Sequence, residues 1–105
     1  MLRFTQNGKT YEASGTDFQV RVWQELRKIP KGQVITYAGL ARRAGRPHSA
    51  RAAANACGAN PLPVIIPCHR VIRSDGGLGG YSGVGGVVRK RTLLRKEGAK
   101  VNSYK

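Results

Sequence analysis

The stretch QVITYAGLARRAGRPHSARAAANACGAN, residues 33–60, contains two short helix-forming segments on either side of a turn. Residues 33–35 are predicted to be extended, residues 37–44 and 49–57 to be helical, and residues 45–47 to form the turn, because Gly and Pro interrupt regular structure. N-caps are expected at Thr36, and at His48 or Ser49. Two short helices joined by a glycine-containing turn form a helix-turn-helix, in which the second helix can face a groove of DNA.

The second helix of this pair carries unusually small side chains. Most of its residues are alanine, so Arg51 and Asn55 are its prominent side chains. Small residues allow a helix backbone to approach a surface closely, as contact with DNA would require. The same composition suits a helix that is tightly packed inside the protein, and both interpretations remain open at this point.

The residues before this pair predict a hairpin or arm and then a helix. Apolar and polar residues alternate around Asn7-Gly8, a pair that favours a two-residue hairpin turn, over residues 1–16. A helix should begin with Thr16 or Asp17 as its N-cap and end before Pro30. Its apolar residues recur at helical spacing and are expected in the core: Phe18, Val22, Trp23, Leu26 and Ile29.

The residues after the pair predict short extended pieces, a glycine-rich loop and a last helix. Three prolines and the loop at 76–86 exclude a long helix there, and residues 64–66 and 71–73 are expected to be extended. The loop suits a backbone that approaches a ligand, although it could also be a flexible link. Residues 87–98 should form an amphipathic helix with Val88, Leu93 and Leu94 inward and Gly98 as C-cap, followed by a frayed tail at 99–105.

The composition indicates one soluble domain with a polyanionic partner. The chain has 105 residues, and 19 Lys and Arg against 5 Asp and Glu give a formal net charge of +14. Such a charge repels itself unless a polyanion neutralises it, and nucleic acid is the obvious candidate. A ribosomal or merely well-solvated basic protein is the alternative. No stretch is long enough to cross a bilayer, and no secretory leader is recognisable.

The segment IPCHRVI, residues 66–72, contains the most reactive side chain of the protein, Cys68. Both Cys57 and Cys68 are expected to be reduced, and their spacing with the two histidines matches no zinc site. A thiolate is favoured by a nearby histidine that a carboxylate orients, but His69 would point away from Cys68 in an extended segment. A catalytic and a buried structural cysteine therefore both remain open.

Several motifs together resemble the O6-alkylguanine-DNA alkyltransferases. The motifs are IPCHRVI, GGLGGYSG and KRTLLRKEG, with GQVITYAGLARRAG and ARAAANACGANPLPV upstream, and the resemblance covers residues 17–98. It implies a mainly α, winged-helix-like domain with a helix-turn-helix, short β segments and an N-terminal hairpin or arm. It also implies direct, irreversible transfer of the alkyl group from O6-alkylguanine to a cysteine after the nucleotide has flipped out of the duplex.

The resemblance assigns a role to each site residue. Cys68 is the alkyl acceptor, and His69 with Glu97 forms a water-bridged relay that removes its proton. Asn60 holds the turn that shapes the site, and Arg51 fills the place of the flipped nucleotide. The remaining assignments are Tyr37 as hydrogen-bond donor to the purine, Tyr81 and Ser82 on the loop that closes over the base, and the carbonyls of Cys68 and Val71 as readers of the exocyclic amine.

The same resemblance defines the setting and an alternative. It implies a monomer that acts on double-stranded DNA without metal or other cofactor, in the cytoplasm at the nucleoid of a prokaryote or in the nucleus of a eukaryote. Many members of the family have a separate N-terminal domain, and the segment from Tyr81 to Glu97 is longer here than in the commoner pattern. The alternative is a non-catalytic alkyltransferase-like protein that binds the lesion and recruits other repair factors, although that group has tryptophan at the position of Cys68.

Overall fold

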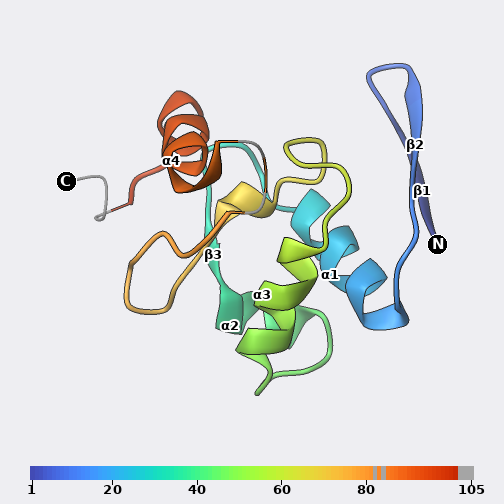
Figure 1. Ribbon diagram of the computed structural model, residues 1–105, viewed down its shortest axis with the longest axis horizontal. Coiled ribbons are helices and arrows are strands. Elements are labelled where there is room, and N and C mark those ends of the chain that lie inside the picture. The colour runs from blue at the N-terminus through green and yellow to red at the C-terminus, as the bar shows by residue number, and fades with distance from the viewer. Residues whose placement is uncertain (82, 84, 102–105) are drawn as a thin grey trace.

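The computed structural model of the protein describes residues 1–81, 83 and 85–101, and it begins with a β-hairpin. Strands β1 (Leu2–Gln6) and β2 (Lys9–Ala13) pair antiparallel, as the hairpin interpretation predicted. Asn7 and Gly8 both have positive φ, 53° and 77°, as a two-residue turn between strands requires. The hairpin packs its buried side chains, Leu2, Phe4 and Ala13, into the main core beside α1 (Figure 1).

Helix α1 (Asp17–Arg27) begins with a reciprocal cap. The Thr16 side chain accepts a hydrogen bond from the Gln19 backbone N–H at 3.1 Å, and the Gln19 side chain accepts one from the Thr16 N–H at 2.9 Å. Thr16, rather than Asp17, is therefore the N-cap. Val22, Trp23 and Leu26 are buried on the inner face, which confirms the apolar periodicity as a core pattern.

Helices α2 (Tyr37–Arg43) and α3 (Ala50–Gly58) confirm the two predicted helices and pack against each other and against α1 (Figure 1). Thr36 caps α2 by accepting a hydrogen bond from the Gly39 N–H at 3.0 Å. Ser49 is at the N-cap of α3 but makes no side-chain cap hydrogen bond. The turn between the helices contains Gly45 at φ 91°, a conformation that favours glycine.

The segment after α3 differs from the prediction, because residues 64–66 form a turn and are not extended. Val64 has a positive φ of 73°, and Pro63 and Ile66 form an isolated bridge. Asn60 closes this turn: its side-chain amide donates to the Ile66 carbonyl at 2.8 Å, and its side-chain oxygen accepts from the Leu62 N–H at 2.9 Å. A long-range side-chain bridge thus overrides the extended preference of the three apolar residues.

Cys68 also lies in a turn, the 3₁₀-helix η1 (Cys68–Arg70), so the expectation of an extended segment around it was wrong. Strand β4 (Val71–Ile72) follows and pairs in parallel with β3 (Ile35–Thr36), which leads directly into α2. The prediction of an extended piece at 71–73 is confirmed for its first two residues. This small sheet joins the segment after Cys68 to the start of the helix-turn-helix.

Helix α4 (Gly86–Lys96) confirms the predicted last helix but presents a different inner face. Val88, expected inward, is 67% exposed, whereas Leu94 and Lys90 are fully buried and Leu93 is half-buried. The inner face is set by the four-residue spacing of Lys90 and Leu94, and Val88 lies outside that stripe.

The C-terminal end of α4 is capped as Gly98 predicted. Gly98 has φ 77°, and the N–H groups of Gly98 and Ala99 donate to the carbonyls of Arg95 and Leu94. Ala99 is only 5% exposed and packs with Leu94, so this first residue of the expected frayed tail is held in place. Residues 102–105 of that tail lie outside the described residues.

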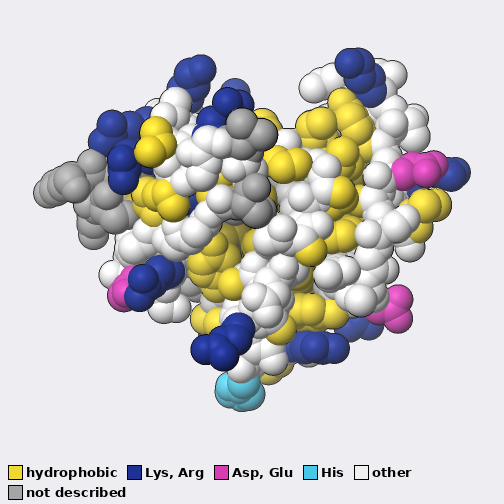
Figure 2. All heavy atoms as spheres, viewed as in Figure 1, with side chains coloured by type: hydrophobic (Ala, Val, Ile, Leu, Met, Phe, Trp, Pro, Cys, Tyr) yellow, Lys and Arg dark blue, Asp and Glu magenta, His cyan; other side chains and the backbone are white. Residues whose placement is uncertain are grey.

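The core lies where α1, α2, α3 and η1 meet, and α4 covers a second, smaller apolar cluster (Figure 1). Lys and Arg side chains surround the face shown in Figure 2, with few acidic ones between them. Within the described residues, no helix has both the length and the apolar character needed to span a membrane.

Candidate functional site

A pocket of about 340 Å³ opens beside Cys68. It is built from α2, α3, η1 and the glycine-rich loop, and its lining residues are Tyr37, Ala54, Cys57, Gly58, Cys68, Gly80 and Tyr81. Cys68 is only 4% exposed, yet its position in the lining gives it access to whatever occupies the pocket. The volume is at the lower end of the range typical of small-ligand sites.

The Cys68 thiol is protonated at rest. Burial raises its pKa above the ordinary value, while a hydrogen bond with Asn60 and the positive charge of Lys90 act in the opposite direction. Cys57, the other free thiol, is also buried, and burial raises its pKa to about 12. Of the two cysteines in the pocket, Cys68 is therefore the one that a base can ionise.

A buried imidazole follows the cysteine in the chain and pairs with a carboxylate from the end of α4. His69 is fully buried, and its Nε2 lies 3.0 Å from Oε2 of Glu97, whose side chain is 8% exposed. Arg70 holds the same carboxylate with two hydrogen bonds, from Nε at 3.0 Å and Nη2 at 2.8 Å, and a third N–H donates to the Ile29 carbonyl at 2.7 Å. The 3₁₀ turn therefore carries Cys68, which lines the pocket, and His69 and Arg70, whose side chains meet on Glu97.

The electrostatics of this group define which imidazole nitrogen carries the proton. Burial raises the pKa of Glu97, but the hydrogen bonds from Arg70 and His69 outweigh burial and hold that pKa below its ordinary value. Burial lowers the pKa of His69, against the opposing effect of Glu97. A neutral imidazole beside an ionised carboxylate donates from Nε2, so Nδ1 keeps its lone pair. Nδ1 is buried and has no hydrogen-bond partner among the described residues, which leaves it able to act as a base.

Lys90 is a site residue that the sequence did not reveal. Its ammonium group is fully buried and donates to the carbonyls of Leu78 and Gly80 and to the Tyr37 hydroxyl at 3.3 Å. Burial lowers its pKa to about 8, so it is mostly charged at neutral pH. It therefore joins the loop to α2, and its positive charge acts to lower the pKa of the Cys68 thiol. The sequence did hold one signal for Lys90: its spacing from Leu94 and Glu97 places all three residues on one face of α4.

Tyr37 is held as a neutral hydrogen-bond donor. Burial raises its pKa to about 12, and the negative charge of ionised Cys57 or Cys68 would act in the same direction. Because Lys90 donates to the Tyr37 oxygen, the hydroxyl proton is free to point elsewhere. Tyr37 lines the pocket, so a ligand acceptor there is within its reach.

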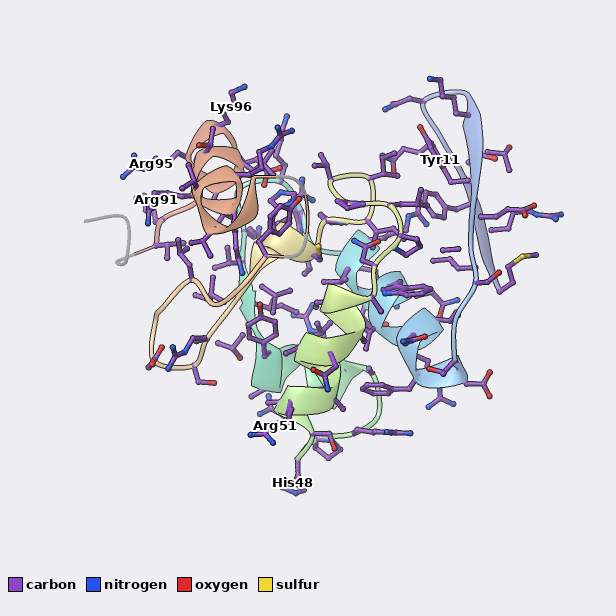
Figure 3. All side chains as sticks on the ribbon, viewed as in Figure 1. Tyr11, His48, Arg51, Arg91, Arg95 and Lys96 are labelled. Carbon is purple, nitrogen blue, oxygen red and sulfur yellow. The ribbon has the colours of Figure 1, made fainter. Side chains whose placement is uncertain are left out.

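A second hollow of about 410 Å³ adjoins the first along α3. The two share Tyr37 and Ala54, and the second also includes Arg51 near the start of α3 and the turn at 73–75. Helix α3 is buried on one side and exposed on the other, where Arg51 and Asn55 project. The packed interpretation of its small residues is confirmed for the buried side, and close approach to DNA stays a prediction for the exposed side. Figure 3 shows Arg51 and His48 together at the free end of the helix-turn-helix.

The structure brings most of the predicted site residues together. Cys68, Tyr37 and Tyr81 line the first pocket, and Arg51 lines the second. His69 and Glu97 form the expected pair, Asn60 closes the expected turn, and Val71 is buried in β4 directly after η1. Ser82 lies outside the described residues. Sequence reasoning missed Lys90, the Arg70 clamp on Glu97, and the presence of Cys57 in the pocket.

Residues 17–99 match the protein family described as "6-O-methylguanine DNA methyltransferase, DNA binding domain". The chain is 57% identical over 84 residues to the methylated-DNA–protein-cysteine methyltransferase of Salmonella typhimurium. The aligned region covers 80% of this chain and 48% of that protein. It is 55% identical over 83 residues to the Escherichia coli bifunctional transcriptional activator/DNA repair enzyme Ada, covering 79% of this chain and 23% of the relative. The chain thus spans about half, or less, of the length of these relatives.

Two solved structures resemble this fold and contain DNA. The Mycobacterium tuberculosis OGT in complex with DNA superposes with a TM-score of 0.77 at 49% identity, over 81% of this chain and 52% of that chain. Atl1 of S. pombe, in complex with damaged DNA containing O6-carboxymethylguanine, gives a TM-score of 0.71 at 32% identity, over 80% of this chain and 78% of the other.

Proposed function

The chain belongs to the 6-O-methylguanine DNA methyltransferase family, and from this we propose that it repairs DNA by taking the alkyl group of O6-alkylguanine onto Cys68. The observation that carries the proposal is a pocket thiol with a neutral, carboxylate-oriented imidazole in the adjacent position. We assign the activity to residues 17–98, as a mainly α, winged-helix-like domain that works as a monomer. It would act on the chromosome, in the cytoplasm of a prokaryote or the nucleus of a eukaryote.

The first step is removal of the damaged nucleotide from the duplex. The O6 substituent is inaccessible in stacked DNA, so the base must flip out at a cost of roughly a few kcal/mol. Arg51 would enter the gap from the minor groove and offset part of that cost. The exposed side of α3 offers mostly small residues around Arg51, which permits a close approach of the helix backbone. The two hollows share Tyr37 and Ala54, and the flipped nucleotide would pass from the one beside Arg51 to the one beside Cys68.

The chemical step is a displacement at the alkyl carbon. The thiol proton of Cys68 passes through a bridging water to Nδ1 of His69, and the sulfur forms a bond to the alkyl carbon as the bond from that carbon to O6 breaks. The departing guanine takes up negative charge, which the Tyr37 hydroxyl quenches by hydrogen bonding to the purine. The proton held by His69 returns through the same water to solvent, and the guanine anion takes up one proton from solvent, so neutral guanine leaves and the imidazole is again uncharged. The other product is a thioether on Cys68, so each protein molecule reacts once, and no metal or organic cofactor takes part.

The remaining residues shape the pocket around the base. Asn60 holds the turn before Cys68 and hydrogen-bonds to its thiol. Tyr81 covers the base from the loop, with Ser82 next to it, and the carbonyls of Cys68 and Val71 read the exocyclic amine. Lys90 supports both the loop and Tyr37.

The test is the intact mass of the protein after incubation with a duplex that contains one O6-methylguanine. We expect a gain of one methyl group in place of one hydrogen, up to one equivalent per protein and no further. The same duplex with unmodified guanine is the control. An unchanged mass after prolonged incubation with saturating damaged duplex would rule out the transfer.

A non-catalytic role in lesion recognition is the second candidate. It is favoured by the similarity to S. pombe Atl1, which extends over most of both chains. In that case the protein would bind the O6-methylguanine duplex and recruit other repair factors without reacting. Tight binding with an unchanged mass would identify this role.

Arg51→Ala should slow repair of duplex DNA by about tenfold or more, because part of the flipping cost is no longer offset. Reaction with free O6-benzylguanine, which needs no flipping, should change little. The two rates are measured by single-turnover mass analysis, with Arg3→Ala on the hairpin as the control. An equal loss of rate on both substrates would show that Arg51 does not act in nucleotide flipping.

Glu97→Gln should slow alkyl transfer by about 100-fold, because an uncharged amide no longer keeps the proton on Nε2 of His69. In the unmodified protein the rate should fall only below about pH 6.5, because burial holds the pKa of His69 beneath that ordinary value. In the variant, the rate should instead rise through alkaline pH as Cys68 ionises without a base. Glu25→Gln, which breaks a surface pair with Lys28, is the control. Identical pH profiles for the two variants would exclude the relay.

A further inference from the structure

The turn after β4 brings a second arginine to the hollow that contains Arg51. This hollow of about 410 Å³ is lined by residues of α3 and of the turn, and Arg73 and Asp75 are among them. Arg51 reaches the same hollow from the start of α3 (Figure 3). Two guanidinium groups from separate elements therefore border one space, an arrangement that suits an anion. The proposed function gives a role to Arg51 but none to Arg73.

The aliphatic part of Arg73 lies against two glycines. A Cβ on Gly77 would be 3.5 Å from Cδ of Arg73, and a Cβ on Gly79 would be 3.4 Å from its Cγ. The Cβ on Gly79 would also be only 3.0 Å from the Tyr37 ring, so the arginine and that ring border the same glycine. A side chain supported in this way loses less rotational freedom when it binds a ligand. Arg73 is thus held close to Tyr37, which lines both hollows.

Asp75 holds the guanidinium group of Arg73 in the free protein. Nη2 of Arg73 donates to Oδ2 of Asp75 at 2.8 Å, and the Gly77 N–H donates to the other carboxylate oxygen at 2.9 Å. The side chains of this ion pair are 62% and 60% exposed. Because an ion pair as exposed as this one contributes little to stability, another anion can replace the carboxylate at small cost.

A flipped nucleotide would bring such an anion into the hollow. In the proposed function its base enters the pocket beside Cys68, while Arg51 fills the gap in the duplex. The sugar-phosphate backbone of the same nucleotide must then run between these two residues, through the hollow that Arg73 borders. A phosphate flanks each side of a nucleotide, and arginine can donate two parallel hydrogen bonds to phosphate as it does to carboxylate. The guanidinium group can therefore exchange one anion for the other.

We propose that Arg73 binds a phosphate that flanks the flipped nucleotide, and that Asp75 occupies the guanidinium group until this phosphate replaces its carboxylate. The proposal rests on the entry of a flipped nucleotide in the proposed function, but not on alkyl transfer. Asp75 is then an internal competitor of DNA, so loss of Arg73 and loss of the Asp75 charge should change the affinity for DNA in opposite directions.

The experiment measures affinity for a duplex that contains one O6-methylguanine, with the full chain carrying Cys68→Ala so that no transfer occurs. Arg73→Gln should weaken binding by about tenfold and reduce the slope of log affinity against log salt by about one. Asp75→Asn should strengthen binding by about fivefold, because Arg73 no longer has to leave a carboxylate before it binds. The asparagine still accepts the hydrogen bond from the Gly77 N–H, so the turn is kept. In the Arg73→Gln protein, the same Asp75→Asn change should alter affinity by less than about twofold.

Uncharged methylphosphonate linkages identify the phosphate. The duplex is made with one such linkage on the 5′ side or on the 3′ side of the lesion. At one of these two positions Arg73→Gln should lose its effect, because the anion that Arg73 contacts is already neutral. The matched control is the hairpin ion pair of Arg3 and Glu12, whose side chains are 63% and 50% exposed. Since this pair lines neither hollow, Arg3→Gln and Glu12→Gln should each change affinity by less than about twofold.

Three outcomes would overturn the phosphate site. Weaker binding by Asp75→Asn as well as by Arg73→Gln would show that the ion pair only shapes the loop. An effect of Arg73→Gln no larger than that of Arg3→Gln would show that Arg73 contacts no phosphate. An effect that persists with both methylphosphonate linkages would show that the phosphate lies elsewhere on the duplex. Alkyl transfer is measured separately, by the intact mass of the parent protein, so a failure of the chemistry is distinguishable from a failure of this site.

Discussion

Cys68→Ala should abolish methyl uptake from O6-methylguanine DNA, with no gain in mass at any incubation time. We expect that Cys57, the second thiol in the pocket, does not take its place, because burial raises the pKa of Cys57 to about 12. Binding of the damaged duplex should persist, since Arg51 and the exposed side of α3 are untouched. The measurement pairs intact mass with a duplex-binding assay.

Cys57→Ala is the matched control for this prediction. It removes a thiol from the same pocket and leaves Cys68, His69 and Glu97 in place. We expect the variant to take up one methyl group, with a modest loss of stability of about 1 kcal/mol from the small cavity. Methyl uptake by the Cys68→Ala protein, or no uptake by the Cys57→Ala protein, would show that Cys68 is not the acceptor.

Lys90→Met should slow alkyl transfer by about 100-fold and lower the free energy of unfolding by about 3 kcal/mol. The rate falls because the carbonyls of Leu78 and Gly80 and the Tyr37 hydroxyl lose their common hydrogen-bond donor. A displacement of about 1 Å in the residues that position the substrate can slow a reaction by about 100-fold. Stability falls because two buried carbonyls are left without their partner. Transfer is followed by intact mass, and stability by urea denaturation.

Two comparisons separate a positioning role for Lys90 from simple loss of folding. Duplex affinity should be unchanged at a temperature where the variant is folded, because Lys90 does not reach the exposed side of α3. Lys96→Met, an exposed change on the same helix, should alter neither the transfer rate on a single duplex nor the stability. A Lys90→Met protein that is folded and transfers at the parent rate would contradict the role.

Elements determined by nearby residues could be predicted from the sequence. Helix α1 follows from Thr16, Gln19 and an apolar stripe within eleven residues, and the hairpin follows from Asn7-Gly8. The helix-turn-helix likewise depends on short-range signals, with Thr36 as cap and Gly45 in the turn. The fold around α3 was therefore accessible without coordinates.

Features determined by distant contacts could not be predicted in this way. The turn at 64–66 depends on the Asn60 side chain reaching the Ile66 carbonyl, a contact that lies close in the chain but follows no residue periodicity, so the apolar run was wrongly expected to be extended. No role was predicted for Lys90, because its hydrogen-bond acceptors belong to residues 37, 78 and 80. The pairing of His69 with Glu97 came from the family resemblance, since 28 residues separate them in the chain.

The two hydrogen bonds between the Asn60 side chain and the backbone also have an evolutionary consequence. They fix the length of backbone between the end of α3 and Cys68, because the Leu62 N–H and the Ile66 carbonyl must both meet one amide. An insertion or deletion there would shift the Cys68 sulfur out of register with α3. The hairpin is under no such constraint, so related chains should vary freely in length at its tip while the interval from α3 to Cys68 keeps a constant number of residues.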